Sequence, residues 1–105
     1  MFVNYEQVIQ LIHNEVNYAA SILSNCEPCV FVDAKENDTI FVMVKFSRMN
    51  FCQYFQFVIN QNEKYSYDEI KMDFECSCKK AILCLVYESY GKENIIERSE
   101  KVEQS

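Results

Sequence analysis

The chain has 105 residues, which suits one domain built around a single hydrophobic core. Half of the residues are hydrophobic and a quarter are charged, so the composition is that of a folded domain and not of a disordered segment. The net charge of −6 disfavours direct binding of nucleic acid, because proteins that hold phosphates do so with basic patches. A partner protein with a basic surface fits this charge better.

Two features of the sequence predict a cytoplasmic protein that does not bind a membrane. The residues from Met1 to Glu6 lack the charged and then apolar layout of a secretory signal. The longest apolar run, residues 81–87, is much shorter than the about 20 residues that cross a bilayer. In a reducing compartment the six cysteines are expected to be free thiols.

An amphipathic helix is predicted over residues 5–24. Apolar residues recur there at steps of three and four, and polar residues occupy the other side. Asn4 supplies an N-cap and Gln7 can complete a capping box, while Pro28 prevents the helix from continuing. The apolar series is Tyr5, Val8, Ile9, Ile12, Val16, Ala19 and Leu23.

Four strands are predicted after this helix. Residues 30–34 and 39–47 flank a polar tetrapeptide and predict a hairpin, and residues 50–60 predict a third strand. Apolar and polar residues alternate strictly from Ile70 to Cys78, which predicts a fourth strand because a strand would place the apolar residues on one face.

The remaining residues predict a second helix and a polar tail. Residues 79–90 suit a helix that ends at Gly91, with a fifth strand over 81–88 as the alternative, and residues 92–105 are polar. The predicted fold class is α+β, a two-layer sandwich in a single domain over residues 1–105. It combines an N-terminal amphipathic helix, an antiparallel sheet of four strands within residues 29–78, with residues 81–88 as the alternative fifth strand, and a C-terminal helix.

The cysteines carry the one pattern that suggests metal chemistry. Cys26 and Cys29 form a CxxC, Cys76 and Cys78 form a CxC, and structural zinc takes four thiolates from two such pairs. The second pair is closer than the usual spacing, and the alternation predicts that both of its cysteines are buried among apolar side chains. We expect no metal and no cofactor, and a zinc-stabilised domain built on these four cysteines is the alternative.

Catalytic patterns are absent from the sequence. His13 is the only histidine and has no patterned nucleophile near it, so a general-base role is not indicated. A single glycine leaves no phosphate-binding loop and no nucleophile elbow. We expect that the protein is not an enzyme, and an enzyme of unrecognised type is the remaining alternative.

The strand over residues 50–60 has large rings on both faces. Either the second helix covers the second ring-bearing face, or some rings form an interface with a partner or with a second copy. Exposed carboxylates are expected on the outer face of the predicted fourth strand and in the turn of the predicted hairpin, between residues 34 and 39. The predicted partner-binding residues are Asp73, Glu75, Glu36, Asp38 and Tyr54.

These features predict a non-enzymatic, acidic protein-binding module. One form of this prediction is a small phage or mobile-element inhibitor that covers a basic surface of a host nucleic-acid-targeting protein. Anti-CRISPR proteins act in this way, and the comparison is an analogy of function, because no motif in this sequence identifies that group.

Overall fold

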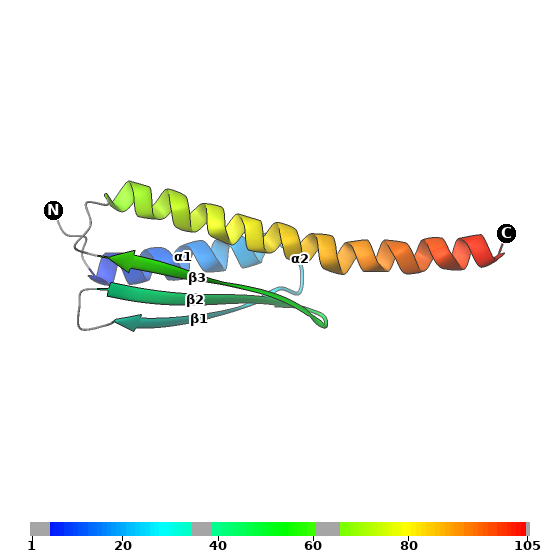
Figure 1. Ribbon diagram of the computed structural model, residues 1–105, viewed down its shortest axis with the longest axis horizontal. Helices are drawn as coiled ribbons and strands as arrows, with labels where there is room; N and C mark the ends of the chain where they lie inside the picture. Colours follow the sequence, from blue (N-terminus) through cyan, green and yellow to red (C-terminus); the bar gives the residue numbers. More distant parts are fainter. Residues whose placement is uncertain (1–4, 35–38, 61–65, 105) are drawn as a thin grey trace.

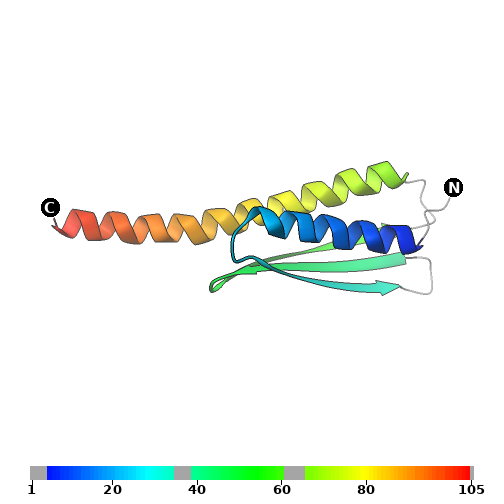
Figure 2. The same ribbon diagram turned by 180° about the vertical axis from the view of Figure 1, so that it is seen from behind.

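The computed structural model describes residues 5–34, 39–60 and 66–104, and the side chains of residues 5–33, 39–60 and 66–90. The elements in chain order are α1 (Tyr5–Ile22), β1 (Glu27–Ala34), β2 (Thr39–Arg48), β3 (Phe51–Asn60) and α2 (Tyr67–Gln104). The strands form one antiparallel sheet in the order β1-β2-β3, and both helices lie on the same face of it (Figures 1 and 2). The predicted α+β class is confirmed, but the sheet has three strands and not four or five.

Helix α1 forms where the apolar periodicity predicts it. Its apolar face is buried against the sheet and α2, with Ile12 and Val8 fully enclosed. The helix ends when Leu23 N donates to Ala20 O at 3.3 Å and Asn25 adopts a φ of 58°, a left-handed conformation that Asn tolerates. Pro28 then enters β1, an edge strand where a missing N–H leaves no ladder bond unmade.

The two hairpins set which side chains share a face. In β2 buried residues alternate with exposed ones from Ile40 to Phe46, and the alternating positions at the two ends of the strand are half-buried. Ile40, Val42, Val44 and Phe46 face the helices, and the residues between them face the opposite side. In β3, Phe55 and Phe57 pack against the buried core.

The prediction of a fourth strand over residues 70–78 is wrong, because these residues belong to α2. Ser66 caps this helix: its Oγ accepts from Glu69 N at 3.2 Å and its carbonyl accepts from Ile70 N at 3.1 Å. Ile70 and Phe74 point into the core, whereas Met72 points into solvent. In a strictly alternating pattern every second apolar residue recurs after four residues, which is close to one helical turn. These residues lie on the buried side of α2, and the apolar residues between them are exposed.

The alternative of a fifth strand over residues 81–88 is also wrong. Ile82, Leu85 and Ser89 continue the buried side of α2, and the Ser89 hydroxyl donates to Leu85 O at 2.7 Å. The helix then runs through Gly91, which does not end it, and through the predicted polar tail to Gln104. A single glycine inside a helix costs only about 1 kcal/mol relative to alanine.

Helix α2 is longer than the sheet that it covers. Its 38 residues span about 57 Å, whereas a ten-residue strand spans about 33 Å. The helix therefore extends beyond the hairpin that joins β2 and β3 (Figure 1). The radius of gyration is 17.4 Å, compared with about 13 Å for a compact domain of this length.

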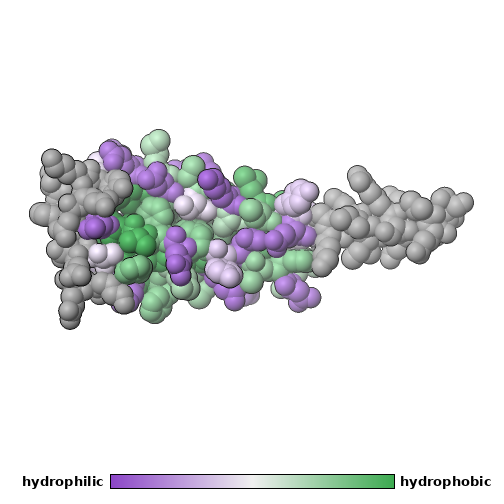
Figure 3. All heavy atoms as spheres, viewed as in Figure 1, coloured by the Kyte–Doolittle hydropathy of each residue, from purple (hydrophilic) through white to green (hydrophobic). Residues whose placement is uncertain are grey.

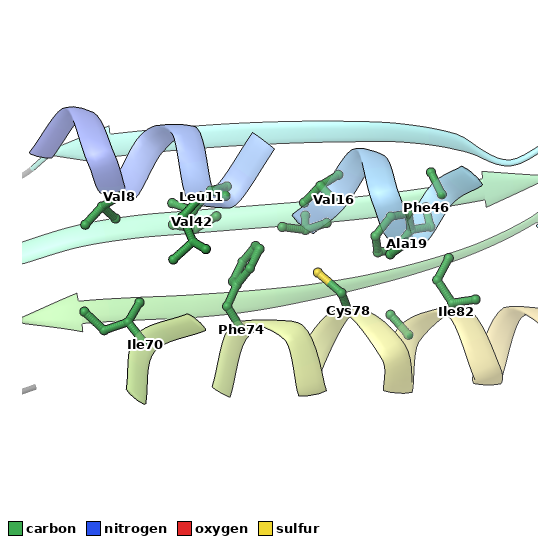
Figure 4. Close-up of a cluster of buried hydrophobic side chains, with 14 of the residues drawn as sticks. Val8, Leu11, Val16, Ala19, Val42, Phe46, Ile70, Phe74, Cys78 and Ile82 are labelled. Carbon is green, nitrogen blue, oxygen red and sulfur yellow. The ribbon is translucent and has the colours of Figure 1, made fainter. Parts of the chain in front are cut away.

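The hydrophobic core lies between the two helices and the covered face of the sheet. Figure 4 shows side chains from α1, β2 and α2 that point toward one another. The Phe74 ring is fully buried at the centre, with its centroid 5.8 Å from that of Phe55 and 5.3 Å from that of Phe57. These tilted and edge-on ring contacts fix α2 over β3.

Candidate protein-binding face

The face of the sheet that is turned away from both helices is uncovered in the described part of the chain. We call it the open face. Tyr54 is 71% exposed there and Phe31 is 62% exposed. The large apolar side chains of the open face are Phe31, Phe41, Met43, Tyr54 and Val58.

The strand register places these residues in adjacent rows. Phe31 pairs with Met43, and directly paired residues of antiparallel strands project from the same face. Phe41 pairs with Val58 in the next row, and Met43, which pairs with Gln56, is the diagonal neighbour of both Val58 and Tyr54 on β3. Figure 3 shows the molecule from the side on which the sheet lies in front of α1. Hydrophobic side chains gather over the strands in this view, and hydrophilic side chains lie between them.

The exposed apolar area of the open face is large for a domain of this size. With about 200 Å² for a whole aromatic side chain, Phe31, Phe41 and Tyr54 together expose about 350 Å². Met43 and Val58 raise the exposed area to about 500 Å², which is in the upper part of the range for the largest patches on monomers. Patches of this size are often functional.

Charged residues are few on the open face. Lys45 lies on the middle strand, between Cys29 of β1 and Tyr54 of β3. Glu27 and Asp33 lie on β1, toward its two ends. The face therefore has an apolar centre, one ammonium group on the middle strand and two carboxylates on an edge strand.

Of the five residues predicted to bind a partner, the three that the structure describes do not share one surface. Tyr54 lies on the open face, whereas Asp73 is exposed on α2, which packs on the other face of the sheet. Glu75 Oε1 lies 3.0 Å from Lys79 Nζ on the next helical turn, and this hydrogen-bonded ion pair raises the pKa of Lys79. Glu36 and Asp38 lie outside the described residues.

The four cysteines of the zinc alternative are separated in the fold. Cys29 is exposed on the open face, and Cys78 is buried on the opposite side of the sheet under α2. Cys76 is exposed, so the prediction that it is buried is wrong, and that for Cys78 is confirmed. Within residues 5–34, 39–60 and 66–90, no group of three or more His, Cys, Asp or Glu could hold a metal ion.

The two enclosed thiols are less acidic than an ordinary cysteine. Burial, together with the nearby carboxylates of Glu15 and Glu75, raises the pKa of Cys78 to about 12. Burial also raises the pKa of Cys26, and the charge of Arg48 opposes that shift. A protonated thiol is a weak nucleophile and a weak metal ligand, so neither environment activates sulfur chemistry.

The sequence reasoning missed four of the open-face residues, namely Phe31, Phe41, Met43 and Val58. The signal was present in β2, where residues 40–46 are apolar at both odd and even positions except for Lys45. A strand that is apolar on both faces predicts a cover on each face. The described chain covers one of them.

No protein-family model, curated protein or solved structure matches this chain significantly. In the part of the chain that the structure describes, neither helix holds a stretch long and apolar enough to cross a membrane.

Proposed function

We propose that this protein is a non-enzymatic binding module that docks onto another protein through the open face of its sheet. The observation that carries the proposal is the set of five contiguous large apolar side chains, each 41% to 71% exposed, on a sheet whose other face is well packed. Burial of about 500 Å² of apolar surface contributes on the order of 12 kcal/mol before the costs of association. Association costs about 4–15 kcal/mol, which is of the same order, so the affinity also depends on how well the partner's surface fits the open face.

The residue types of the open face favour a protein as the ligand. Aromatic residues and methionine are enriched at protein interfaces, where rings act as anchors and methionine adapts to irregular shapes. Tyr54 and Phe31 lie on opposite edge strands, so together they define the width of the contact. The face is broad and follows the sheet, which suits a protein surface better than a small molecule.

The net charge supports a partner whose contact surface is bordered by basic groups. Glu27 and Asp33 border the open face, and the whole chain carries a charge of −6. Complementary potentials increase the rate of association and suppress wrong partners. The proposal includes an inhibitory form, in which the domain covers the basic groove of a host nucleic-acid-targeting protein and so excludes nucleic acid from it.

The test compares equally exposed tyrosines on opposite sides of the protein. Tyr54→Ala removes a ring from the open face, and Tyr87→Ala removes a ring that is 81% exposed on α2. We expect Tyr54→Ala to weaken capture of the partner from a lysate at least tenfold, as for a large aromatic side chain in an interface, and Tyr87→Ala to capture it as the wild type does. Capture that depends on Tyr87 and not on Tyr54 would contradict the proposal.

A further inference from the structure

We infer that, when no partner is bound, the open face is covered by the open face of a second copy of this chain. The protein is then an isologous dimer in which two three-stranded sheets pack face to face between two outer layers of helices. This inference rests on the proposed function in that both use the open face, and it adds that self-association and partner binding exclude each other.

The area of the open face matches what a stable dimer needs. A standard interface buries about 800 Å² on each partner. About 60% of such an area is apolar, which is about 480 Å². The five large apolar side chains of the open face expose about 500 Å², so one further copy covers the apolar surface that the helices leave exposed.

The geometry of the sheet suits its own copy. Two sheets pack about 10 Å apart with their strands about 30° from parallel, and the side chains of the two inner faces interdigitate. Small side chains lie beside large ones on the two edge strands of the open face, where Cys29 lies two residues before Phe31 and Cys52 two residues before Tyr54, whereas Phe41, Met43 and Lys45 follow one another on β2. A two-fold axis can therefore set the rings of each copy beside the smaller residues of the other.

The charges of the open face permit a like-charged partner. The chain carries −6, but the open face carries Glu27 and Asp33 against Lys45, which leaves a net charge of −1 there. Lys45 has a long apolar stem, so its ammonium group can reach the edge of a sheet-on-sheet contact while the stem stays buried. Repulsion between two copies is therefore low at the surface where they meet.

Self-association has a consequence for partner binding. A face that is buried in the dimer binds a partner only after the dimer dissociates. The apparent affinity for the partner is therefore the affinity of the monomer multiplied by the fraction of the protein that is monomeric. Tight partners displace the second copy and weak ones do not. The dimer thus conceals an apolar surface that would otherwise promote unspecific aggregation.

Native thiols report on this interface without any substitution. Cys29 and Cys52 are exposed on the open face, and Cys76 and Cys84 are exposed on α2. The rate of alkylation by iodoacetamide is measured at each cysteine by peptide mass spectrometry over a range of protein concentrations, beside the mass from sedimentation equilibrium. We expect a dimer mass at high protein concentration. Cys29 should then be alkylated at least tenfold more slowly than at low concentration, and the alkylation rate of Cys76 should not change. A monomer mass throughout, or equal protection of Cys29 and Cys76, would overturn the inference.

A matched pair of substitutions locates the contact. Phe31→Asp places a carboxylate on the open face and Leu83→Asp places one on α2, at side chains 62% and 67% exposed, with the fold checked by circular dichroism. We expect Phe31→Asp to be monomeric and Leu83→Asp to dimerise as the wild type does. Dissociation by Leu83→Asp alone would place the contact on the helices and refute the inference. If the wild type is a monomer and Tyr54→Ala abolishes capture of the partner, only the dimer is refuted. If the wild type is a dimer that Phe31→Asp dissociates, and Tyr54→Ala still captures the partner, only the proposed function is refuted.

Discussion

The guanidinium of Arg48 lies 4.0 Å from the centroid of the Tyr90 ring, at the point where α2 passes the end of the sheet. Arg48 is buried, and its Nε donates to Ser24 O at 3.1 Å in the turn after α1. One side chain therefore connects the end of β2 to both helices. A guanidinium group is planar and can make both contacts at once. The Tyr90 ring packs against the face of the guanidinium, and the Ser24 carbonyl accepts a hydrogen bond from an N–H group at its edge.

Replacement of Arg48 should destabilise the fold. Arg48→Ala removes the cation–π contact and leaves Ser24 O without its donor, and together these losses should lower the free energy of unfolding by about 2–4 kcal/mol. Tyr90→Phe keeps the ring and should change it by less than about 0.5 kcal/mol. Urea denaturation followed by circular dichroism measures both. An Arg48→Ala variant with the midpoint of the wild type would show that this contact does not hold α2.

The docking of α1 is tested by an isoleucine at its buried centre. Ile12 is fully buried, so Ile12→Ala should lower the free energy of unfolding by about 2–5 kcal/mol because it leaves a cavity. Ile22 is 60% exposed at the end of the same helix, and Ile22→Ala should cost less than about 0.5 kcal/mol. The two variants share the same chemical change, so thermal unfolding of both separates burial from helix propensity. Equal melting of the two would mean that α1 is not packed as described.

The start of α2 is tested by its capping serine. Ser66→Ala should lower the free energy of unfolding by about 1 kcal/mol, because the Glu69 N–H loses its acceptor. Ser77 lies in mid-helix and its hydroxyl donates to Asp73 O, a bond that adds little to helix stability. Ser77→Ala should therefore be neutral or slightly stabilising. If residues 70–78 were a strand, both substitutions would act alike.

The sequence held the information for α2, but the alternation concealed it. Ile70, Phe74 and Cys78 recur every four residues, and Met72 and Cys76 lie between them at the same period. A strand would bury all five, whereas the helix buries the first three and exposes the other two. The segment Ser66-Tyr67-Asp68-Glu69 has the pattern of a capping box and indicates the start of a helix. In the structure the Ser66 hydroxyl accepts from the backbone N–H of Glu69.

The open face was predictable only in part. The rings on both sides of β3 made Tyr54 a predicted interface residue, and the structure places it on the open face. Phe31 and Met43 join it only through the register of three strands, and strand pairing is a tertiary fact that local periodicity does not contain. Asp73 and Glu75 were predicted on the outer face of a fourth strand, and the structure places both of them on α2 instead.

Alkaline pH should weaken the fold through Cys78. The pKa of its thiol is raised to about 12 in the folded state, and an unfolded thiol ionises near 9. The folded state therefore holds its proton more tightly, so the contribution is complete below pH 9 and is lost as the pH rises toward 12. The slope should reach about 1.4 kcal/mol per pH unit in that window. Denaturation from pH 7 to 10.5 should show a shallower decline for Cys78→Ala than for the wild type, and an unchanged one for the exposed control Cys76→Ala.

Charge and aromatic contacts should act on different rates of partner binding. Asp73→Lys changes the net charge from −6 to −4 outside the open face, so it should slow association with a basic partner and leave dissociation unchanged. Salt should act in the same direction, since the Debye length falls to about 8 Å at physiological ionic strength. Tyr54→Ala should instead speed dissociation by about tenfold or more, because it removes the most exposed ring of the open face. Surface plasmon resonance against the captured partner, with Tyr87→Ala as the control, measures both rates. Association that is insensitive to salt and to Asp73→Lys would remove charge from the mechanism and leave the apolar contact of the open face as the source of affinity.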